Sequence, residues 1–140
     1  MFFILIIHLL LILTGRGIYT GRSFISERYA GASVSLVAGA YGISTAVWWG
    51  IYVIPSFWTV VLSVAAGFGI GWLSGQGSAL IAGAMHGLAS GVMGTMLAAA
   101  LQNPALCGIP VQPVDYQLVV ILVTAFFGVS VLLLEGIHLH

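Results

Sequence analysis

The residues best suited to chemistry in this sequence of 140 residues are a histidine and three methionines in one apolar stretch. In a helix, which turns by about 100° per residue, Met85 and Met96 lie within about 20° of each other, and so do His86 and Met93. Thioether and imidazole groups are good ligands for soft ions such as Cu(I). The spacing therefore predicts a His/Met face on one side of a helix, with these four residues as a candidate metal site.

The same face also has an interpretation without metal. Methionine is a common apolar filler, and a lone histidine more often bonds a carbonyl or a hydroxyl group, such as that of Ser90 one turn on. Packing is our main interpretation, and binding of Cu(I) or transfer of protons are the alternatives. No other metal ion or cofactor is expected.

Glycines recur every four residues in two neighbouring apolar stretches, so each stretch carries a face without side chains. The stripes are Gly67, Gly71, Gly75 and Gly83, Gly87, Gly91. Such stripes let helix backbones approach closely in lipid. We expect an antiparallel hairpin folded about Gly77, which would pair Gly71 with Gly83, Gly67 with Gly87, Ser63 with Gly91 and Gly75 with Ala79.

The preceding stretch has a looser pattern of small residues on two lines. One line contains Gly31, Ser35 and Gly39, and the other contains Gly42, Ala46 and Gly50. We expect this stretch to pack against both of its neighbours.

The composition identifies the solvent around these helices. Apolar residues make up 61% of the chain and charged residues only 4%, whereas soluble proteins have about a quarter of their residues charged. The lipid bilayer is therefore the expected surroundings, and three arginines are too few for nucleic-acid binding.

Five apolar segments are long enough to cross a membrane as helices. They predict an all-α, polytopic transmembrane bundle that forms one integral membrane domain over residues 1–140. The expected helices cover residues 2–19, 30–54, 56–73, 78–101 and 116–134. Breaks fall at Pro55, in residues 74–77, and in a segment with Pro104, Pro110 and Pro113.

The three basic residues, Arg16, Arg22 and Arg28, all lie between the first and second of these segments. The positive-inside rule places that connection in the cytoplasm. The amino terminus is then outside and the carboxyl terminus is cytoplasmic. We expect the membrane to be the plasma membrane of a bacterium or an archaeon. Aromatic residues agree, because Trp48, Trp49, Tyr52 and Trp58 flank the Pro55 turn.

Other reactive side chains are scattered. His8 is expected to make a structural hydrogen bond or a contact with another helix. Cys107 is expected to be an ordinary free thiol. Glu135, His138 and His140 could form a weak metal site, but chance also supplies such a trio at a chain end. Asp115 is expected at the amino end of the last helix, where a negative charge is favourable.

The sequence contains no phosphate-binding loop, serine-hydrolase elbow, zinc-protease motif or pair of carboxylates, so we do not expect an enzyme. Two functions remain. The first is a structural or accessory subunit of a membrane complex, associated with other membrane subunits or with itself. The second is a homo-oligomeric transporter or handler of a soft metal ion such as copper, using the His/Met face.

The glycine stripes generate a first testable prediction. Gly87→Leu should disrupt folding, because a branched side chain would enter a close helix contact, whereas Leu122→Ala in the lipid-facing last helix should be tolerated. The measurement is recovery of folded chain from detergent extracts of the membrane. Equal recovery of the two variants would contradict the expected packing.

Overall fold

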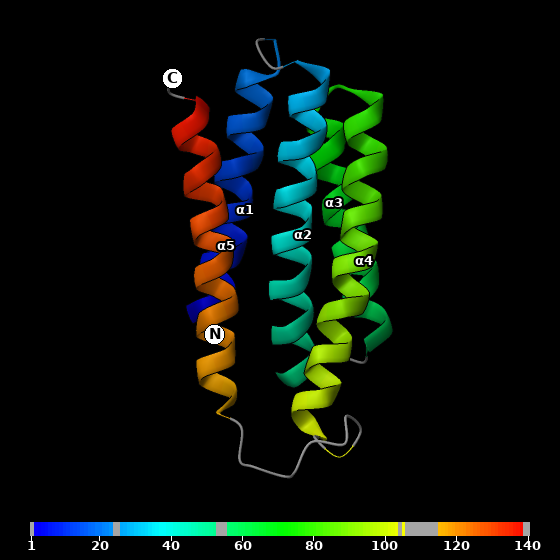
Figure 1. Cartoon of the computed structure of the whole chain (residues 1–140), viewed down its shortest axis with the longest axis vertical. Helices are drawn as coiled ribbons and strands as arrows, with labels where there is room; N and C mark the ends of the chain where they lie inside the picture. Colours follow the sequence, from blue (N-terminus) through cyan, green and yellow to red (C-terminus); the bar gives the residue numbers. More distant parts are fainter. Residues whose placement is uncertain (1, 24–25, 53–55, 104, 106–114, 139–140) are drawn as a thin grey trace.

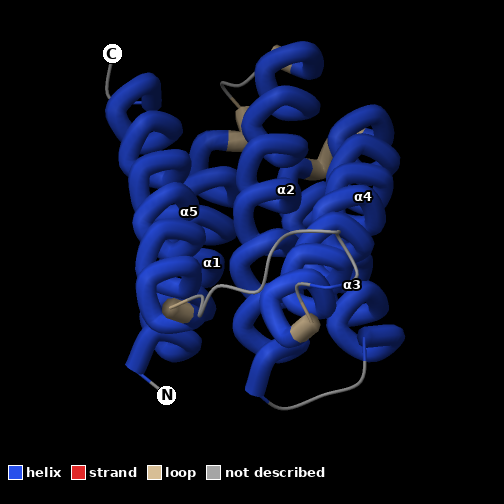
Figure 2. Tube along the Cα trace, turned by 60° about the horizontal axis from the view of Figure 1, so that its bottom comes forward, coloured by secondary structure: helices blue, strands red, loops and turns tan. Residues whose placement is uncertain are grey.

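The computed structural model describes residues 2–23, 26–52, 56–103, 105 and 115–138, and these residues are almost entirely helical. Figures 1 and 2 show a bundle in which α2 stands between α3 and α4 on one side and α1 and α5 on the other. The helices are α1 (Phe2–Gly21), α2 (Glu27–Tyr52), α3 (Ser56–Ser74), α4 (Gly77–Gln102) and α5 (Tyr116–His138).

Three of the helices are long and apolar enough to cross a membrane. These spans are Glu27–Tyr52, Phe57–Ser74 and Gly77–Gln102, and α1 and α5 contain shorter apolar segments, Leu5–Gly21 and Gln117–Leu132. The prediction of an all-helical chain with membrane-spanning potential is thus confirmed in this coarser form.

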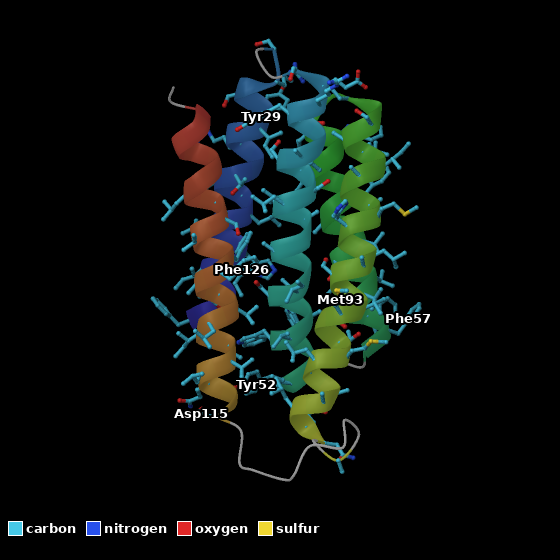
Figure 3. All side chains as sticks on the ribbon, viewed as in Figure 1. Tyr29, Tyr52, Phe57, Met93, Asp115 and Phe126 are labelled. Atoms are coloured by element: carbon cyan, nitrogen blue, oxygen red, sulfur yellow. The ribbon has the colours of Figure 1, made fainter. Side chains whose placement is uncertain are left out.

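The helices run alternately up and down, so that the three arginines lie at or near one end of the bundle (Figure 1). This arginine end also holds the turn between α3 and α4 and the end of α5. Figure 3 places Tyr29 near the arginine end, and Tyr52 and Asp115 near the opposite end. Tyr52 belongs to an aromatic cluster there, with ring centroids of Trp48 and Tyr52 5.4 Å apart.

Local chemistry accounts for where the helices begin and end. Gly75 adopts a φ of +73°, a left-handed conformation that favours glycine and ends α3 after Ser74. At the start of α5, the Asp115 Oδ1 atom accepts a hydrogen bond of 2.9 Å from the Gln117 backbone N–H. Asp115 thus lies at the amino end of α5, as expected, and its side chain caps the helix. Pro55 and the three later prolines lie outside the described residues.

Helices α2, α3 and α4 form the most closely packed part of the bundle. Here α2 packs most extensively against α4, and α4 packs next most against α3, whereas α1 and α5 make fewer contacts with the rest. Many residues of α2 are buried, among them Val34, Val37, Ala46 and Val47. The helices without glycine stripes are thus the peripheral ones.

Helices α3 and α4 approach each other so closely that several glycines have no room for a side chain. A Cβ atom placed on Gly67 would collide with the carbonyl oxygen of Gly83, and one placed on Gly83 would collide with that of Gly67. A Cβ atom on Gly87 would lie 2.5 Å from the carbonyl oxygen of Ser63.

The expected register of this hairpin is wrong by about one helical turn. Gly83 pairs with Gly67 rather than with Gly71, and Gly71 instead faces Leu80, whose Cα would lie 2.6 Å from an added Cβ. The cause is the position of the turn: the chain reverses at residues 75–76, not about Gly77. The expected contact of Ser63 with Gly91 is present, at 2.9 Å between the Ser63 Cβ and an added Cβ.

A polar junction joins α2, α3 and α4 where three small residues meet. The Ser63 hydroxyl donates to the Gly42 carbonyl (3.4 Å), and the Ser90 hydroxyl donates to the Ala38 carbonyl (3.3 Å). A Cβ atom on Gly42 would collide with the Ser90 side chain. Each hydroxyl has a single proton, which it shares with a closer carbonyl of its own helix, that of Thr59 (2.9 Å) for Ser63 and that of Gly87 (3.2 Å) for Ser90.

Two glycines of α3 provide a matched test of this packing. An alanine methyl at Gly67 would meet the α4 backbone, whereas one at Gly69 would meet nothing within 4 Å. We predict that Gly67→Ala lowers the free energy of unfolding by about 1–3 kcal/mol, as overpacking does, and that Gly69→Ala leaves it unchanged or raises it by up to about 1 kcal/mol, because alanine favours a helix interior over glycine. Denaturant titration in detergent micelles measures both, and equal effects would contradict the close approach.

Candidate functional site

The His/Met face lies on the outer surface of α4, away from the glycines of that helix. The side chains of Met85, Met93 and Met96 are 62%, 64% and 67% exposed. His86 is also exposed, and its Nδ1 atom lies 2.9 Å from the Ala82 carbonyl oxygen, a hydrogen bond to the preceding turn. The partner of His86 is thus a backbone carbonyl and not the hydroxyl of Ser90, which bonds other carbonyls.

The helix rise limits what these side chains can bind together. His86 and Met93 are about 10.5 Å apart along the axis, and Met85 and Met96 about 16.5 Å apart, at 1.5 Å per residue. Only Met93 and Met96, three residues apart, are close enough to approach one ion from a single chain. Among the described residues, no group of three or more His, Cys, Asp or Glu side chains could hold a metal ion.

A shallow groove runs along α2 between α4 and α5. It has a volume of about 400 Å³, with His86 from α4 on one wall and Phe126 from α5 on the other. Its floor includes the small residues Ser35 and Gly39, which belong to the first of the two small-residue lines of α2. A Cβ atom added to Gly31 or Gly39 would meet nothing within 4 Å.

The two small-residue lines of α2 therefore have different roles in the bundle. On the second line, Gly42 contacts Ser90 and Ser63, and a Cβ atom on Gly50 would lie 2.8 Å from the Cβ of Ala98. That line packs against α3, which follows α2 in the sequence, and against α4. The first line is half-buried, and its glycines Gly31 and Gly39 have space beside them.

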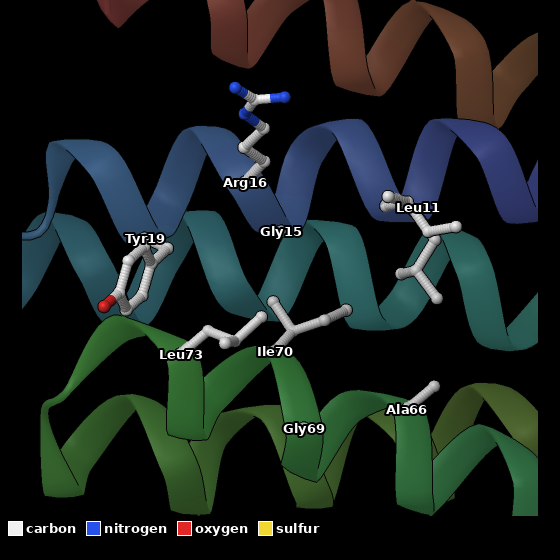
Figure 4. A pocket seen from close by; sticks show the side chains of 9 residues that line it. Leu11, Gly15, Arg16, Tyr19, Ala66, Gly69, Ile70 and Leu73 are labelled. Carbon is white, nitrogen blue, oxygen red and sulfur yellow. The ribbon is translucent and has the colours of Figure 1, made fainter.

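A second groove separates α1 from α3 (Figure 4). It has a volume of about 450 Å³, and its lining is almost purely apolar, with Leu11 and Ile12 of α1 facing Ala66 and Ile70 of α3. Gly69 lies in its wall and leaves it open. Figure 4 shows Tyr19 at one end of the groove, near Leu73, and Arg16 pointing away from the α3 side.

A smaller recess of about 360 Å³ lies where α3 turns into α4. Its lining is more polar than that of the two grooves and includes Arg22, Gln76 and Gly77. The Arg22 guanidinium carbon lies 4.4 Å from the centroid of the Tyr19 ring. Tyr19 lines the α1–α3 groove, so this cation–π contact connects a lining residue of the groove with one of the recess.

His8 makes the expected hydrogen bond, and its partner is Tyr41. The His8 Nε2 atom lies 3.3 Å from the Tyr41 hydroxyl oxygen, and the two rings are nearly perpendicular. Tyr41 also contacts the ring of Phe127, with the centroids 6.0 Å apart. This group links α1, α2 and α5, and it is the polar counterpart of the Ser63–Ser90 junction in the other half of the bundle.

Other predicted site residues fall outside what can be described. Cys107 and His140 lie outside the described residues, and so do the side chains of Glu135 and His138. The two grooves were missed by sequence reasoning. Each had a signal in the sequence, because Gly69 lies outside the α3 glycine stripe and Gly31 and Gly39 lie on a line of their own on α2.

Comparison of the chain with protein-family models, curated proteins and solved structures finds no match. The fold and its surfaces therefore define only a class: a helical protein with three helices able to span a membrane and an apolar outer surface.

The Tyr41–His8 pair gives a further prediction. Tyr41→Phe removes one hydroxyl that joins α2 to α1 and keeps the ring packing, so the free energy of unfolding should fall by about 0.6 kcal/mol, and by no more than about 1.7. Tyr52→Phe, at a residue that is 52% exposed, is the control and should have no measurable effect. A Tyr41→Phe chain as stable as the parent would show that this hydrogen bond contributes nothing.

Proposed function

We propose that this protein is a non-catalytic, structural or accessory subunit of a membrane complex. Its arginine end would face the cytoplasm, and all five helices would lie in the bilayer. The glycines of α3 and α4 would mediate their close packing there, because lipid tails cannot drive apolar helices together and side-chain-free surfaces gain dispersion contacts instead.

The observation that supports this proposal best is the open line of small residues on α2. In this bundle, small residues that face another helix are in close contact with it, as Gly42, Gly83 and Gly87 are. Gly31 and Gly39 present the same kind of surface with nothing opposite it. In a membrane, such a surface suits the close approach of another helix.

The outer face of α4 extends this surface. Met85, Met93 and Met96 project from the bundle instead of filling its core, so the packing interpretation of these residues requires lipid or another subunit as the partner. Methionine is flexible and polarizable, and it adapts well to a partner surface. The α2 groove and the methionines together form one candidate docking face, with His86 between them.

The experiment is purification of the full chain from its native membrane in mild detergent, followed by native mass measurement. We predict a stoichiometric complex with other membrane proteins that is lost in Gly39→Leu, because leucine would fill the α2 groove. Gly128→Leu is the matched control, since Gly128 is also open but lies on α5. A photo-crosslinking residue at Leu36 should link the chain to the partner, whereas one at Leu132 should not.

Purification of the parent chain alone, or equal loss of the partner in Gly39→Leu and Gly128→Leu, would contradict the proposed docking face.

A second candidate is a homo-oligomer that handles copper. The observation that favours it is the exposed pair Met93 and Met96, three residues apart, which two chains together could convert into a site with four thioethers. It predicts a homo-oligomer that carries copper, with less bound copper and lower cellular copper tolerance in Met93→Ala. Unchanged metal content and tolerance in that variant would rule out this candidate.

A further inference from the structure

The α1–α3 groove and the recess at the α3–α4 turn together match the shape and polarity of a single ligand. The exposed surface of the groove is almost entirely apolar, although Arg16 and Tyr19 belong to its lining, whereas the recess contains an arginine and an amide side chain. Arg22 of the recess contacts the ring of Tyr19, which lines the groove. The groove volume of about 450 Å³ is in the range of ligand pockets, about 300–1,000 Å³.

The length of the groove shows which kind of apolar molecule fits. On α1 its lining runs from Leu11 to Tyr19, eight residue steps or about 12 Å of helix. The hydrocarbon core of a bilayer is about 30 Å thick, so the groove covers most of one leaflet and ends there. A transmembrane helix would need a surface along both leaflets, whereas a lipid acyl chain needs only one.

The charge of the recess shows which headgroup fits. Arg22 is exposed and lines the recess, and its guanidinium can form paired hydrogen bonds to a phosphate group. The start of α4 adds to the positive potential there, since Gln76 precedes the helix without a side-chain capping bond. The charged residues at the arginine end also favour an anion, because the three arginines outnumber the two glutamates, Glu27 and Glu135.

We propose that this groove and recess bind one anionic phospholipid from the leaflet at the arginine end. Its phosphate lies against Arg22, and one acyl chain lies between α1 and α3, along Leu11, Ile70 and Gly69. The bound lipid then fills the space between the loosely packed α1 and the compact α2–α3–α4 unit. The inference rests on the proposed membrane insertion, but not on the proposed partner subunit.

The test is native mass spectrometry of the full chain from micelles with equal amounts of dioleoylphosphatidylglycerol and dioleoylphosphatidylcholine. The parent chain should retain one phosphatidylglycerol, with a preference over phosphatidylcholine of about fivefold, the change expected for one basic residue at an anionic surface. Arg22→Gln should abolish the preference. Arg28→Gln should keep it, because Arg28 is an exposed arginine at the same end that lines neither the groove nor the recess.

A second pair of variants tests the acyl chain. Gly69→Leu should reduce retention of both lipids, because leucine would occupy the groove, whereas Gly128→Leu should not, although both glycines are open. Equal retention of the two lipids by the parent chain, or equal effects of Arg22→Gln and Arg28→Gln, would overturn the proposal.

The same spectra report the number of chains and so distinguish the other occupant. A parent chain that is a dimer and becomes a monomer in Gly69→Leu would show that a second copy covers the groove, which would also overturn the proposal. Failure of the proposed membrane function has a different signature, since the chain would not be recovered folded from membranes at all. A chain that is folded and binds its partner but shows no lipid preference contradicts only the lipid site.

Discussion

The structure depends on one physical constraint: at several glycines, helices α2, α3 and α4 approach so closely that a side chain would collide with the facing helix. Carbonyl oxygens of Gly67, Gly83 and Ser63 occupy the positions where a facing Cβ atom would be. Contacts this close maximise dispersion between backbones, and they are sensitive to a single added methyl group. Helices α1 and α5 pack more loosely on the other side of α2 and leave part of that helix open as a groove.

Hydroxyl groups complement this packing without adding bulk. Ser63 and Ser90 reach backbone carbonyls of α2, and Ser44 of α2 reaches the Val123 carbonyl of α5 at 3.3 Å. Serine is small enough to occupy a close helix contact and still offers a donor. The same helices thus gain specific orientation from a few polar bonds and closeness from the absence of side chains.

The sequence predicted the elements well, because their signals are local. Apolar length, prolines and the Gly75–Gly77 segment located all five helices, and Asp115 located the start of α5. The alternating up-and-down direction of the helices followed from counting the expected membrane crossings. The arginine end is thus defined by the fold, whatever membrane surrounds it.

The pairing of residues across helices was less predictable. The four-residue period of glycine shows which face is free of side chains, but it does not fix the register, because shifting one stripe by a turn still places small residues opposite small residues. The turn decides the register, and its position depends on which of two neighbouring glycines, Gly75 or Gly77, adopts the left-handed conformation. The two grooves depend on the spacing between helices, which no single stretch of sequence contains.

The most direct test of the central claim is solid-state NMR of the chain in lipid bilayers, with ¹³C-labelled glycine. We predict a strong cross-peak between Gly67 and Gly83, because a Cβ atom added to either residue would collide with the carbonyl oxygen of the other. The contradicting result is a spectrum in which Gly83 correlates with Gly71 instead, or in which Gly83 shows no contact with any glycine of α3.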